Sequence, residues 1–137
     1  MPVSIDIQEE WMLSIMETTG ENKRFMIEDR SGQPVGMTGI YGINWIHRTC
    51  EFGVFIGVKE EQGKGYGSEA YRIMEGFGGK YLNLRKIKVF VVKENAAAVT
   101  MYRKLGFRQA GELQDERFIN GRYCSVLILE KLLGGGK

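Results

Sequence analysis

Gln62-Gly63-Lys64-Gly65-Tyr66-Gly67 is the stretch on which the interpretation of the whole chain depends. It follows the apolar run 52–58 and precedes a helical pattern that starts near Ser68. A strand that leads through closely spaced glycines into a helix presents backbone N–H groups at the helix start with little side-chain bulk. Because such a loop cradles a phosphate or pyrophosphate, the sequence predicts an anionic ligand here.

Two better-known glycine-rich loops do not fit this stretch. The Walker pattern requires Gly, four residues, Gly, Lys and then Ser or Thr, and no such string occurs. The dinucleotide fingerprint, placed on Gly63, Gly65 and Ser68, lacks its third glycine. An ordinary turn before a helix N-terminus is the alternative to a phosphate site.

Length and composition indicate a single domain that needs no metal or disulfide staple. The chain has 137 residues, 43% hydrophobic and 26% charged, as in an ordinary globular protein. We expect one domain over residues 1–133 and a flexible tail over 134–137. No run approaches the roughly 18 apolar residues of a membrane span, and no signal peptide is recognised. The net charge of +2 is too small to indicate a nucleic-acid partner.

The cysteines and the histidine form no metal-binding pattern. Cys50 and Cys124 are far apart in the sequence, and His47 is the single histidine. We therefore expect no metal. Free thiols without a targeting segment fit a reducing cytoplasm, and filling of the core by two small apolar side chains is the alternative explanation.

Hydrophobic periodicity predicts the elements before the glycine loop. Mixed apolar and acidic positions over Ile5–Met16 indicate a short amphipathic helix. The strands Phe25–Asp29 and Val35–Ile43 flank a Ser-Gly-Gln-Pro turn and are expected to form a hairpin. A third strand over Cys50–Val58 then leads into the loop.

The pattern after the loop alternates helices and strands. A helix from about Ser68 to Tyr81 is weakened by three glycines, each of which costs about 1 kcal/mol against alanine. Asn95 is a good N-cap for a second helix and Gly106 a good stop. Asn120-Gly121 predicts a tight hairpin with positive φ at both residues. The remaining elements are expected as strand 86–92, helix 95–105, strand 107–119 with a kink at Gly111, and strand 123–130.

Three positions of the glycine loop carry a resemblance to a known family. Gln62, Gly65 and Gly67 match the pattern Gln/Arg, two residues, Gly, one residue, Gly/Ala. In the GCN5-related N-acetyltransferases this pattern binds the pyrophosphate of acetyl-coenzyme A, and the chain resembles this family over about Phe25–Leu132. The resemblance implies an α/β (α+β) fold, with a mixed, mostly antiparallel sheet flanked by helices. The family's usual first strand and helix are missing before Ile5.

A second group of residues adds to this resemblance. Asn95, Tyr102 and the pair Gly106-Phe107 recur in the family's second motif. Seven residues are nearly two helical turns, so Asn95 and Tyr102 are expected to face one cleft. An N-cap and a half-buried aromatic are the ordinary explanation. The segments 43–48, 82–87 and 118–123 resemble the branch that includes spermidine, ribosomal-protein N-terminal and amino-sugar acetyltransferases.

The resemblance implies an enzyme that transfers an acetyl group from acetyl-coenzyme A to a primary amine. The acceptor would be a polyamine, a protein N-terminus or an amino sugar, small molecule or peptide. In this branch an acid commonly stands two residues after Tyr123, where this chain has Ser125, so the acceptor class stays open. A catalytically weak acyl-coenzyme A binding module or sensor is the alternative function, and a plain interaction domain is a third.

Acyl transfer to an amine requires a base, a stabiliser for the oxyanion and an acid for the leaving thiolate. Glu51 is the candidate base, acting directly or through a water, with Glu116 in reserve. Pairing of Glu51 with Arg48 or a lysine is the alternative. The resemblance makes Tyr102 the acid and places the oxyanion near a backbone N–H of 56–58, where the family splays its strands.

The coenzyme site is expected to draw on the loop, the strand before it and the second helix. Its predicted residues are Ile56, Val58, Gln62, Gly63, Lys64, Gly65, Tyr66, Gly67, Ser68, Asn95 and Lys104. The candidates for the acceptor site are Tyr41, Trp45, His47 and Tyr123.

The shortened N-terminus also predicts self-association. Without an earlier strand, Phe25–Asp29 would form a sheet edge with unpaired backbone groups, and bare edges recruit another chain. We therefore expect a homodimer, or pairing with a separate element.

Overall fold

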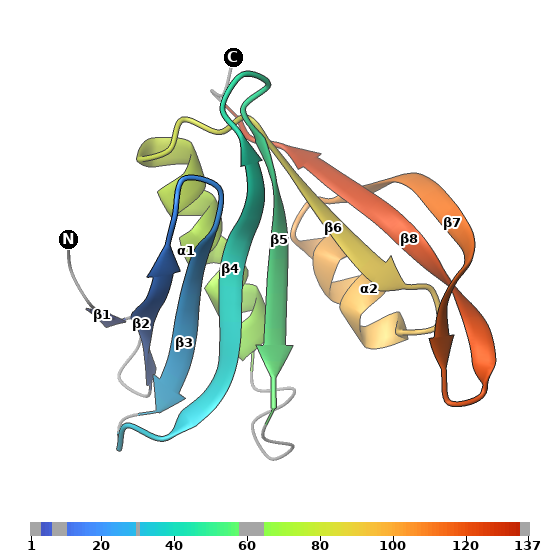
Figure 1. Ribbon diagram of the computed structural model, residues 1–137, viewed down its shortest axis with the longest axis horizontal. Coiled ribbons are helices and arrows are strands. Elements are labelled where there is room, and N and C mark those ends of the chain that lie inside the picture. The colour runs from blue at the N-terminus through green and yellow to red at the C-terminus, as the bar shows by residue number, and fades with distance from the viewer. Residues whose placement is uncertain (1–3, 7–10, 30, 58–64, 135–137) are drawn as a thin grey trace.

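One mixed sheet and two helices make up the fold in the computed structural model, which describes residues 4–6, 11–29, 31–57 and 65–134 (Figure 1). The sheet order is β1-β2-β3-β4-β5-β6-β8-β7, antiparallel throughout except for the parallel pair β5–β6. This confirms the α+β class. The strands are β1 (Ser4–Asp6), β2 (Trp11–Thr18), β3 (Lys23–Asp29), β4 (Pro34–Asn44), β5 (Thr49–Ile56), β6 (Lys86–Val92), β7 (Arg108–Ile119) and β8 (Arg122–Leu132), and the helices are α1 (Tyr66–Lys80) and α2 (Ala96–Lys104).

The N-terminal segment differs from the expectation. The helix predicted over Ile5–Met16 is wrong, because this segment contains β1 and most of β2. β2 pairs with β3 from Trp11↔Asp29 to Thr18↔Lys23, so the prediction of β3 as the sheet edge is wrong too. An isolated helix of about 12 residues is marginal in water, whereas pairing with β3 satisfies a row of backbone groups that would otherwise be left open.

Local turn chemistry explains the two tight hairpins. Between β3 and β4, Asp29 Oδ1 accepts hydrogen bonds from Ser31 Oγ at 2.7 Å, Gln33 N at 3.0 Å and Ser31 N at 2.9 Å, and these bonds lower the pKa of Asp29. Between β7 and β8, Asn120 and Gly121 have φ of 50° and 81°, which confirms the predicted turn. The predicted kink at Gly111 is also present, since the β7–β8 register shifts between Gln109 and Gly111.

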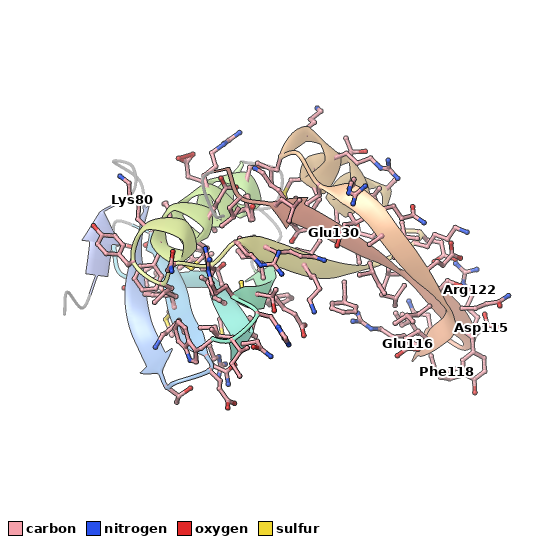
Figure 2. The ribbon with its side chains drawn as sticks, turned by 90° about the horizontal axis from the view of Figure 1, so that it is seen from above. Lys80, Asp115, Glu116, Phe118, Arg122 and Glu130 are labelled. Carbon is pink, nitrogen blue, oxygen red and sulfur yellow. The ribbon has the colours of Figure 1, made fainter. Side chains whose placement is uncertain are left out.

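Both helices pack on the same face of the sheet, as Figure 2 shows from above. Each helix is the connection between two parallel strands, β5–α1–β6 and β6–α2–β7. Both crossovers move in the same direction along the sheet, and right-handed crossovers of this kind place their helices on the same face. Asn95 is the N-cap of α2, since its Oδ1 accepts from Ala98 N at 3.1 Å. Gly106 follows α2 with φ of 100°, as predicted. α1 begins at Tyr66, two residues before the predicted start.

An aromatic cluster fills the core beneath the two helices. The rings of Phe52 and Tyr71 lie 5.1 Å apart, and those of Tyr71 and Phe107 also 5.1 Å apart. Tyr102 from α2 meets Phe107 at 5.3 Å and Phe52 at 6.2 Å. Edge-to-face contacts of this kind add about 0.5–1.5 kcal/mol each beyond the burial of their area. The cluster therefore joins β5, α1, α2 and the start of β7.

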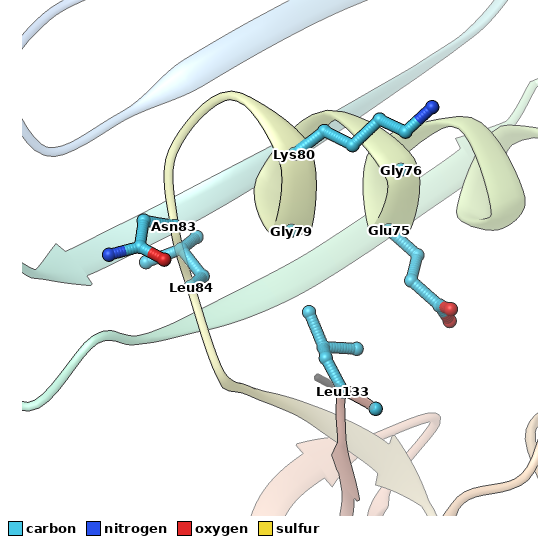
Figure 3. A pocket seen from close by; sticks show the side chains of 8 residues that line it. Glu75, Gly76, Gly79, Lys80, Asn83, Leu84 and Leu133 are labelled. Carbon is cyan, nitrogen blue, oxygen red and sulfur yellow. The ribbon is translucent and has the colours of Figure 1, made fainter. Parts of the chain in front are cut away.

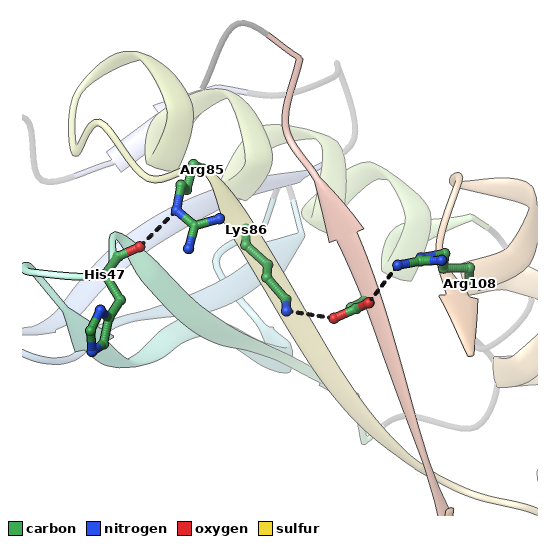
Figure 4. Close-up of polar contacts among 5 residues, drawn as sticks. His47, Arg85, Lys86 and Arg108 are labelled. Atoms are coloured by element: carbon green, nitrogen blue, oxygen red, sulfur yellow. Dashed lines mark hydrogen bonds and ion pairs between the residues drawn. The ribbon is translucent and has the colours of Figure 1, made fainter. Parts of the chain in front are cut away.

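Polar contacts join the strands β6, β7 and β8 on the face of the sheet that the helices do not cover, and a further one joins the β4–β5 turn to Arg85 just before β6 (Figure 4). Glu130 of β8 forms ion pairs with Lys86 of β6 at 2.6 Å and with Arg108 of β7 at 3.1 Å. These cations hold the pKa of Glu130 below its ordinary value. Arg85 Nε donates to the carbonyl oxygen of His47 at 2.9 Å.

The strands β5 and β6 pair over a short distance and then diverge (Figure 1). Their register contains only Thr49↔Lys86, Cys50↔Ile87 and Glu51↔Lys88. Beyond Glu51 the two strands are not paired with each other, although β5 continues to Ile56 and β6 to Val92. This is the strand splay that the resemblance implied.

Candidate active site

The start of α1 has the backbone geometry of an anion site. Gly65 is the N-cap residue with φ of 86°, a left-handed conformation that favours glycine, and no side chain caps the helix. An ideal Cβ on Gly65 would meet no atom of the described residues within 4 Å. Uncapped N–H groups and the helix dipole together attract a phosphate. Four predicted loop residues, Val58, Gln62, Gly63 and Lys64, lie outside the described residues.

Gly67 allows α1 to approach α2 and β5. An ideal Cβ on Gly67 would lie 3.1 Å from Met101 Sδ and 3.9 Å from Val54 Cγ1. A larger residue would push the first turn of α1 away from both elements. Ser68 follows in the same turn and is half-buried. The glycine therefore has a packing role as well as the role implied by the loop pattern.

Where β5 separates from β6, its backbone amides point alternately toward β4 and toward the side of β6. Gly57 N donates to Val35 O at 2.9 Å, so the amide of Gly57 faces β4. Because successive amides of a strand alternate, those of Ile56 and Val54 face the side on which β5 and β6 separate. This favours Ile56 over Gly57 as the donor for an oxyanion in the predicted stretch 56–58.

Tyr102 lies on the helix-covered side of the sheet and is 6% exposed. Its ring is held edge-on between Phe52 and Phe107. Burial raises the pKa of Tyr102 above its ordinary value, because the phenolate would be poorly solvated. The hydroxyl therefore keeps its proton at neutral pH and is suited to donate a hydrogen bond.

Glu51 lies on the opposite face of the sheet. Its neighbours Cys50 and Phe52 are 1% and 5% exposed in the core, whereas the Glu51 side chain is exposed. Its cross-strand neighbours are Tyr41 on β4 and Lys88 on β6. No ion pair joins Glu51 to another of the described residues, and Arg48 Nε instead donates to Asn83 O at 2.8 Å. Glu51 and Tyr102 thus flank the sheet from its two sides, next to the line where β5 and β6 separate.

The remaining predicted residues are spread along α2 and over distant turns. Asn95 is exposed and uses its side-chain oxygen as a cap, and Lys104 is exposed in the last turn. Trp45 lies in the β4–β5 turn, where its Nε1 donates to Gly20 O at 2.8 Å. Tyr123 lies on the β7–β8 hairpin against Phe118, with ring centroids 5.0 Å apart. The acceptor candidates therefore do not form one cluster.

Two further predicted positions also lie on the β7–β8 hairpin. Figure 2 shows Glu116, the reserve base, on the outer part of this hairpin near Asp115 and Arg122. Ser125 Oγ accepts a hydrogen bond from Asp115 N at 3.2 Å. Ser125 thus holds the irregular part of β7, where Asp115 has φ of 51°.

Sequence reasoning missed one arrangement on the open face of the sheet. Gly39 and Gly53 are cross-strand partners, and the ring of Tyr41 lies across both. A Cβ on Gly39 would lie 2.8 Å from Tyr41 Oη, and one on Gly53 would lie 3.2 Å from Tyr41 Cε2. The available signal was the alternation that places Gly39, Tyr41 and Glu51 on one face.

The thiols and carboxylates offer no metal centre in the described part of the chain. No group of three or more His, Cys, Asp or Glu side chains is arranged to hold an ion there. Cys50 and Cys124 are free and buried, and burial raises the pKa of Cys50 to about 12, so its thiol stays protonated. Both cysteines fill the core.

A cavity of about 240 Å³ lies at the other end of α1 from Gly65 (Figure 3). None of the predicted site residues lines it. Its lining residues are Glu75, Gly76, Gly79, Lys80, Asn83, Leu84, Leu133 and Gly134. We therefore assign it no part in the candidate site.

Comparison with known proteins identifies the family. The model of the acetyltransferase (GNAT) domain matches residues 1–108. The chain belongs to the GNAT acetyltransferase family. This confirms the resemblance inferred from the glycine loop and from the motif at Asn95 and Tyr102.

Spermidine N(1)-acetyltransferases are prominent among the relatives. The Escherichia coli K12 protein is 43% identical over 105 residues, which are 77% of this chain and 55% of the relative. The Vibrio cholerae protein is 39% identical over 104 residues, 76% of this chain and 60% of the relative. A putative ribosomal N-acetyltransferase of Bacillus subtilis is 25% identical over 101 residues, 74% of this chain and 55% of the relative. The chain spans little more than half the length of these curated relatives.

Solved structures confirm the fold. A dodecameric spermidine N-acetyltransferase of Vibrio cholerae superposes with a TM-score of 0.77 at 37% identity, covering 82% of this chain and 66% of the other. A spermidine/spermine N-acetyltransferase of the same organism in complex with manganese gives the same TM-score and coverage. No helix among the described residues of this chain is long and apolar enough to cross a membrane.

Proposed function

We propose that this protein transfers the acetyl group of acetyl-coenzyme A to a primary amine, and that the preferred acceptor is a polyamine such as spermidine. The observation that carries the proposal is the uncapped start of α1 at Gly65, located beside the diverging strands of a GNAT fold. The names of the relatives support the choice of polyamine over a protein N-terminus or an amino sugar. A cytoplasmic location is part of the proposal.

In this proposal the coenzyme is held by backbone groups more than by side chains. The N–H groups of the first turn of α1, from Tyr66 to Ser68, would bind its phosphates, together with the predicted loop residues before Gly65. The edge of β5 that faces away from β4, at Val54, would pair with its amide-bearing arm. Asn95 and Lys104 of α2 are proposed as outer contacts.

The acceptor amine would reach the thioester carbonyl from the face that carries Glu51. An alkyl amine has a pKa of about 10, so it must lose a proton before its nitrogen can attack. Glu51, directly or through a water, would take this first proton and pass it to solvent, and would then take the second proton, which the nitrogen loses once the C–N bond has formed and as the C–S bond breaks. The exposed Glu51 carboxylate and the absence of an ion pair among its described neighbours support this role.

Tyr102 would stabilise the departing sulfur by a hydrogen bond. Full transfer of a proton from a phenol of pKa about 10 to a thiolate of pKa about 8.5 is uphill by about 2 kcal/mol. The raised pKa of Tyr102 makes full transfer still less favourable. A strong hydrogen bond to the thiolate, with protonation completed by solvent, is therefore the proposed role.

The first experiment separates an enzyme from a binding module. Acetyl-coenzyme A should stabilise the native state by about 2.7 kcal/mol at a hundredfold excess over Kd, and thiol release should appear with spermidine. Gly65→Val should abolish both effects, because a β-branched side chain opposes the positive φ and occupies the space before the helix.

Gly32→Val is the matched control for this experiment. Gly32 has φ of 87° and, like Gly65, no atom within 4 Å of an ideal Cβ, but it lies in the β3–β4 turn. Both variants should lose similar stability, and only Gly65→Val should lose coenzyme binding. Coenzyme binding without thiol release from any amine would favour the binding module, and equal binding by both variants would refute the phosphate site.

A further inference from the structure

The feature that carries this inference is the ring of Tyr41 on the open face of the sheet. Gly39 on β4 and Gly53 on β5 are directly opposite each other, so two neighbouring positions of this face have no side chain. The Tyr41 ring leans back along β4 and fills this space, with Oη and Cζ over Gly39 and Cε2 over Gly53. The ring is thus held against the backbone, and Tyr41 remains partly exposed.

Glu51 is the cross-strand neighbour of Tyr41 on the same face. Opposite residues of an antiparallel pair have Cβ atoms about 4.5–5.5 Å apart. The next residue of β5 on this face after Glu51 is Gly53, which lies under the Tyr41 ring. The ring lies over Gly39 and Gly53, and the Glu51 carboxylate lies near Gly42, where an ideal Cβ would be 3.8 Å from Glu51 Oε2. Both groups are therefore on this face, with the base of Tyr41 between them. The face of an aromatic ring attracts an ammonium group within about 6 Å of its centre.

A polyamine differs from a monoamine by further ammonium groups a few methylenes from the one that reacts. The reacting nitrogen must become neutral at Glu51, whereas the neighbouring nitrogen keeps its charge. A π-face can hold that charge without taking its proton. Arg24, the cross-strand partner of Gly39, and Lys88, the partner of Glu51, oppose a further cation on this face, so the attraction of the ring and of Glu51 must outweigh this repulsion.

We propose that the Tyr41 ring is the seat of the non-reacting ammonium group of the acceptor, and that it makes Tyr41 a specificity-determining residue. The inference rests on the proposed function. It states in addition that selection of a polyamine over a monoamine depends on the ring face of Tyr41 and not on its hydroxyl. The glycines at 39 and 53 are required because any Cβ there would displace the ring.

The test compares kcat/KM for spermidine with kcat/KM for butylamine. In Tyr41→Leu the ratio of the two should fall by about 3- to 30-fold, the range that corresponds to loss of a cation–π contact. In Tyr41→Phe it should stay within about twofold. Gly53→Ala should lower the ratio in the same direction by a smaller factor, because its Cβ pushes the ring from its position without removing it.

Tyr81→Leu is the matched control, since Tyr81 is a 76% exposed tyrosine at the C-terminal end of α1. Thermal unfolding and acetyl-coenzyme A binding establish that each variant is folded, and Gly53→Ala decides the question if Tyr41→Leu does not fold. If the ratio of kcat/KM for spermidine to that for butylamine is unchanged in the folded variants, or if both amines lose activity equally, the Tyr41 ring does not bind the non-reacting ammonium group. The proposed acetyltransferase activity would not be affected by that result. A wild-type protein that acetylates no amine would overturn the proposed function and this inference together.

Discussion

Tyr102 illustrates how one buried residue can serve both packing and chemistry. Its ring belongs to the aromatic cluster with Phe52 and Phe107, so the core fixes where its hydroxyl lies. Removal of the hydroxyl leaves the ring, and most of its packing, in place. The two roles can therefore be separated by a single substitution.

Tyr102→Phe should lower kcat while leaving acetyl-coenzyme A binding nearly unchanged. A positioned acid of this kind contributes typically 10²- to 10⁴-fold, and it acts on the sulfur only as the bond breaks. Rapid-quench kinetics, under conditions where chemistry limits the rate, measures the effect. A loss of less than about twofold would remove Tyr102 from the mechanism.

Tyr71→Phe is the control for this prediction. Tyr71 belongs to the same cluster and is fully buried; its hydroxyl makes no hydrogen bond of good geometry with the described residues, although burial and the nearby Glu75 carboxylate raise its pKa. Loss of that hydroxyl removes a desolvated polar group, so stability should be kept or slightly raised. The value of kcat should be that of the wild type.

At the scale of single residues, the sequence predicts what local chemistry decides. The cap at Asn95, the stop at Gly106 and the turn at Asn120-Gly121 each follow from side-chain or backbone preferences within a few positions. The ring of Tyr41 over two glycines could not be predicted in this way. It depends on the register between β4 and β5, which brings Gly39 opposite Gly53 only after the hairpin has formed.

At the scale of elements, α1 has a mechanical weakness in its second half. Gly76, Gly78 and Gly79 lie in its last two turns. They are not equivalent, because a Cβ on Gly78 would lie 3.4 Å from Leu84 Cδ1 and 3.5 Å from Ile40 Cδ1, whereas one on Gly76 would meet no atom within 4 Å. Gly78 thus allows the helix to approach the sheet, and Gly76 has no such role.

Gly76→Ala should stabilise the protein by about 1 kcal/mol, the difference between the two residues in a helix interior. Urea unfolding of the wild type and the variant measures the change. Gly78→Ala provides the comparison and should gain less, since its methyl group must fit against Leu84 and Ile40. Destabilisation by Gly76→Ala would mean that the cavity beside it must stay open for the fold.

Hydrophobic periodicity alone predicts some elements correctly and others wrongly. Lys86–Val92 was predicted with its observed bounds because a β-branched run in the middle of a sheet admits one interpretation. The segment 5–16 was predicted wrongly because its apolar residues occur at both even and odd positions, as well as at helical spacing. Pairing with β3, which is not visible in the segment itself, decided the outcome.

At the scale of the whole molecule, the open question is association. β3 offers no bare edge for a second chain, because β2 pairs along it. The proposal of a homodimer is kept on another observation, since Phe118 and Tyr123 are 65% and 64% exposed on the β7–β8 hairpin. Exposed apolar patches of this kind mark interaction sites.

Light scattering across a dilution series should therefore give a mass above that of one chain at high concentration. Activity with spermidine, measured over the same series, should follow the mass if the acceptor site needs a second copy. A strictly monomeric protein with full activity at every concentration would show that one chain builds its own acceptor site.

The short pairing of β5 with β6 has a mechanical consequence. Among the described residues, three pairs, from Thr49↔Lys86 to Glu51↔Lys88, form the ladder between the strands β1–β5 and the strands β6–β8. The aromatic rings of Phe52, Tyr71, Tyr102 and Phe107 pack against one another next to this short ladder, on the helix-covered face of the sheet. Because interiors are close-packed, we expect a substitution that changes the volume of one of these rings to change the separation of β5 and β6 beyond Glu51, and with it the proposed site, although the substituted residue touches no ligand.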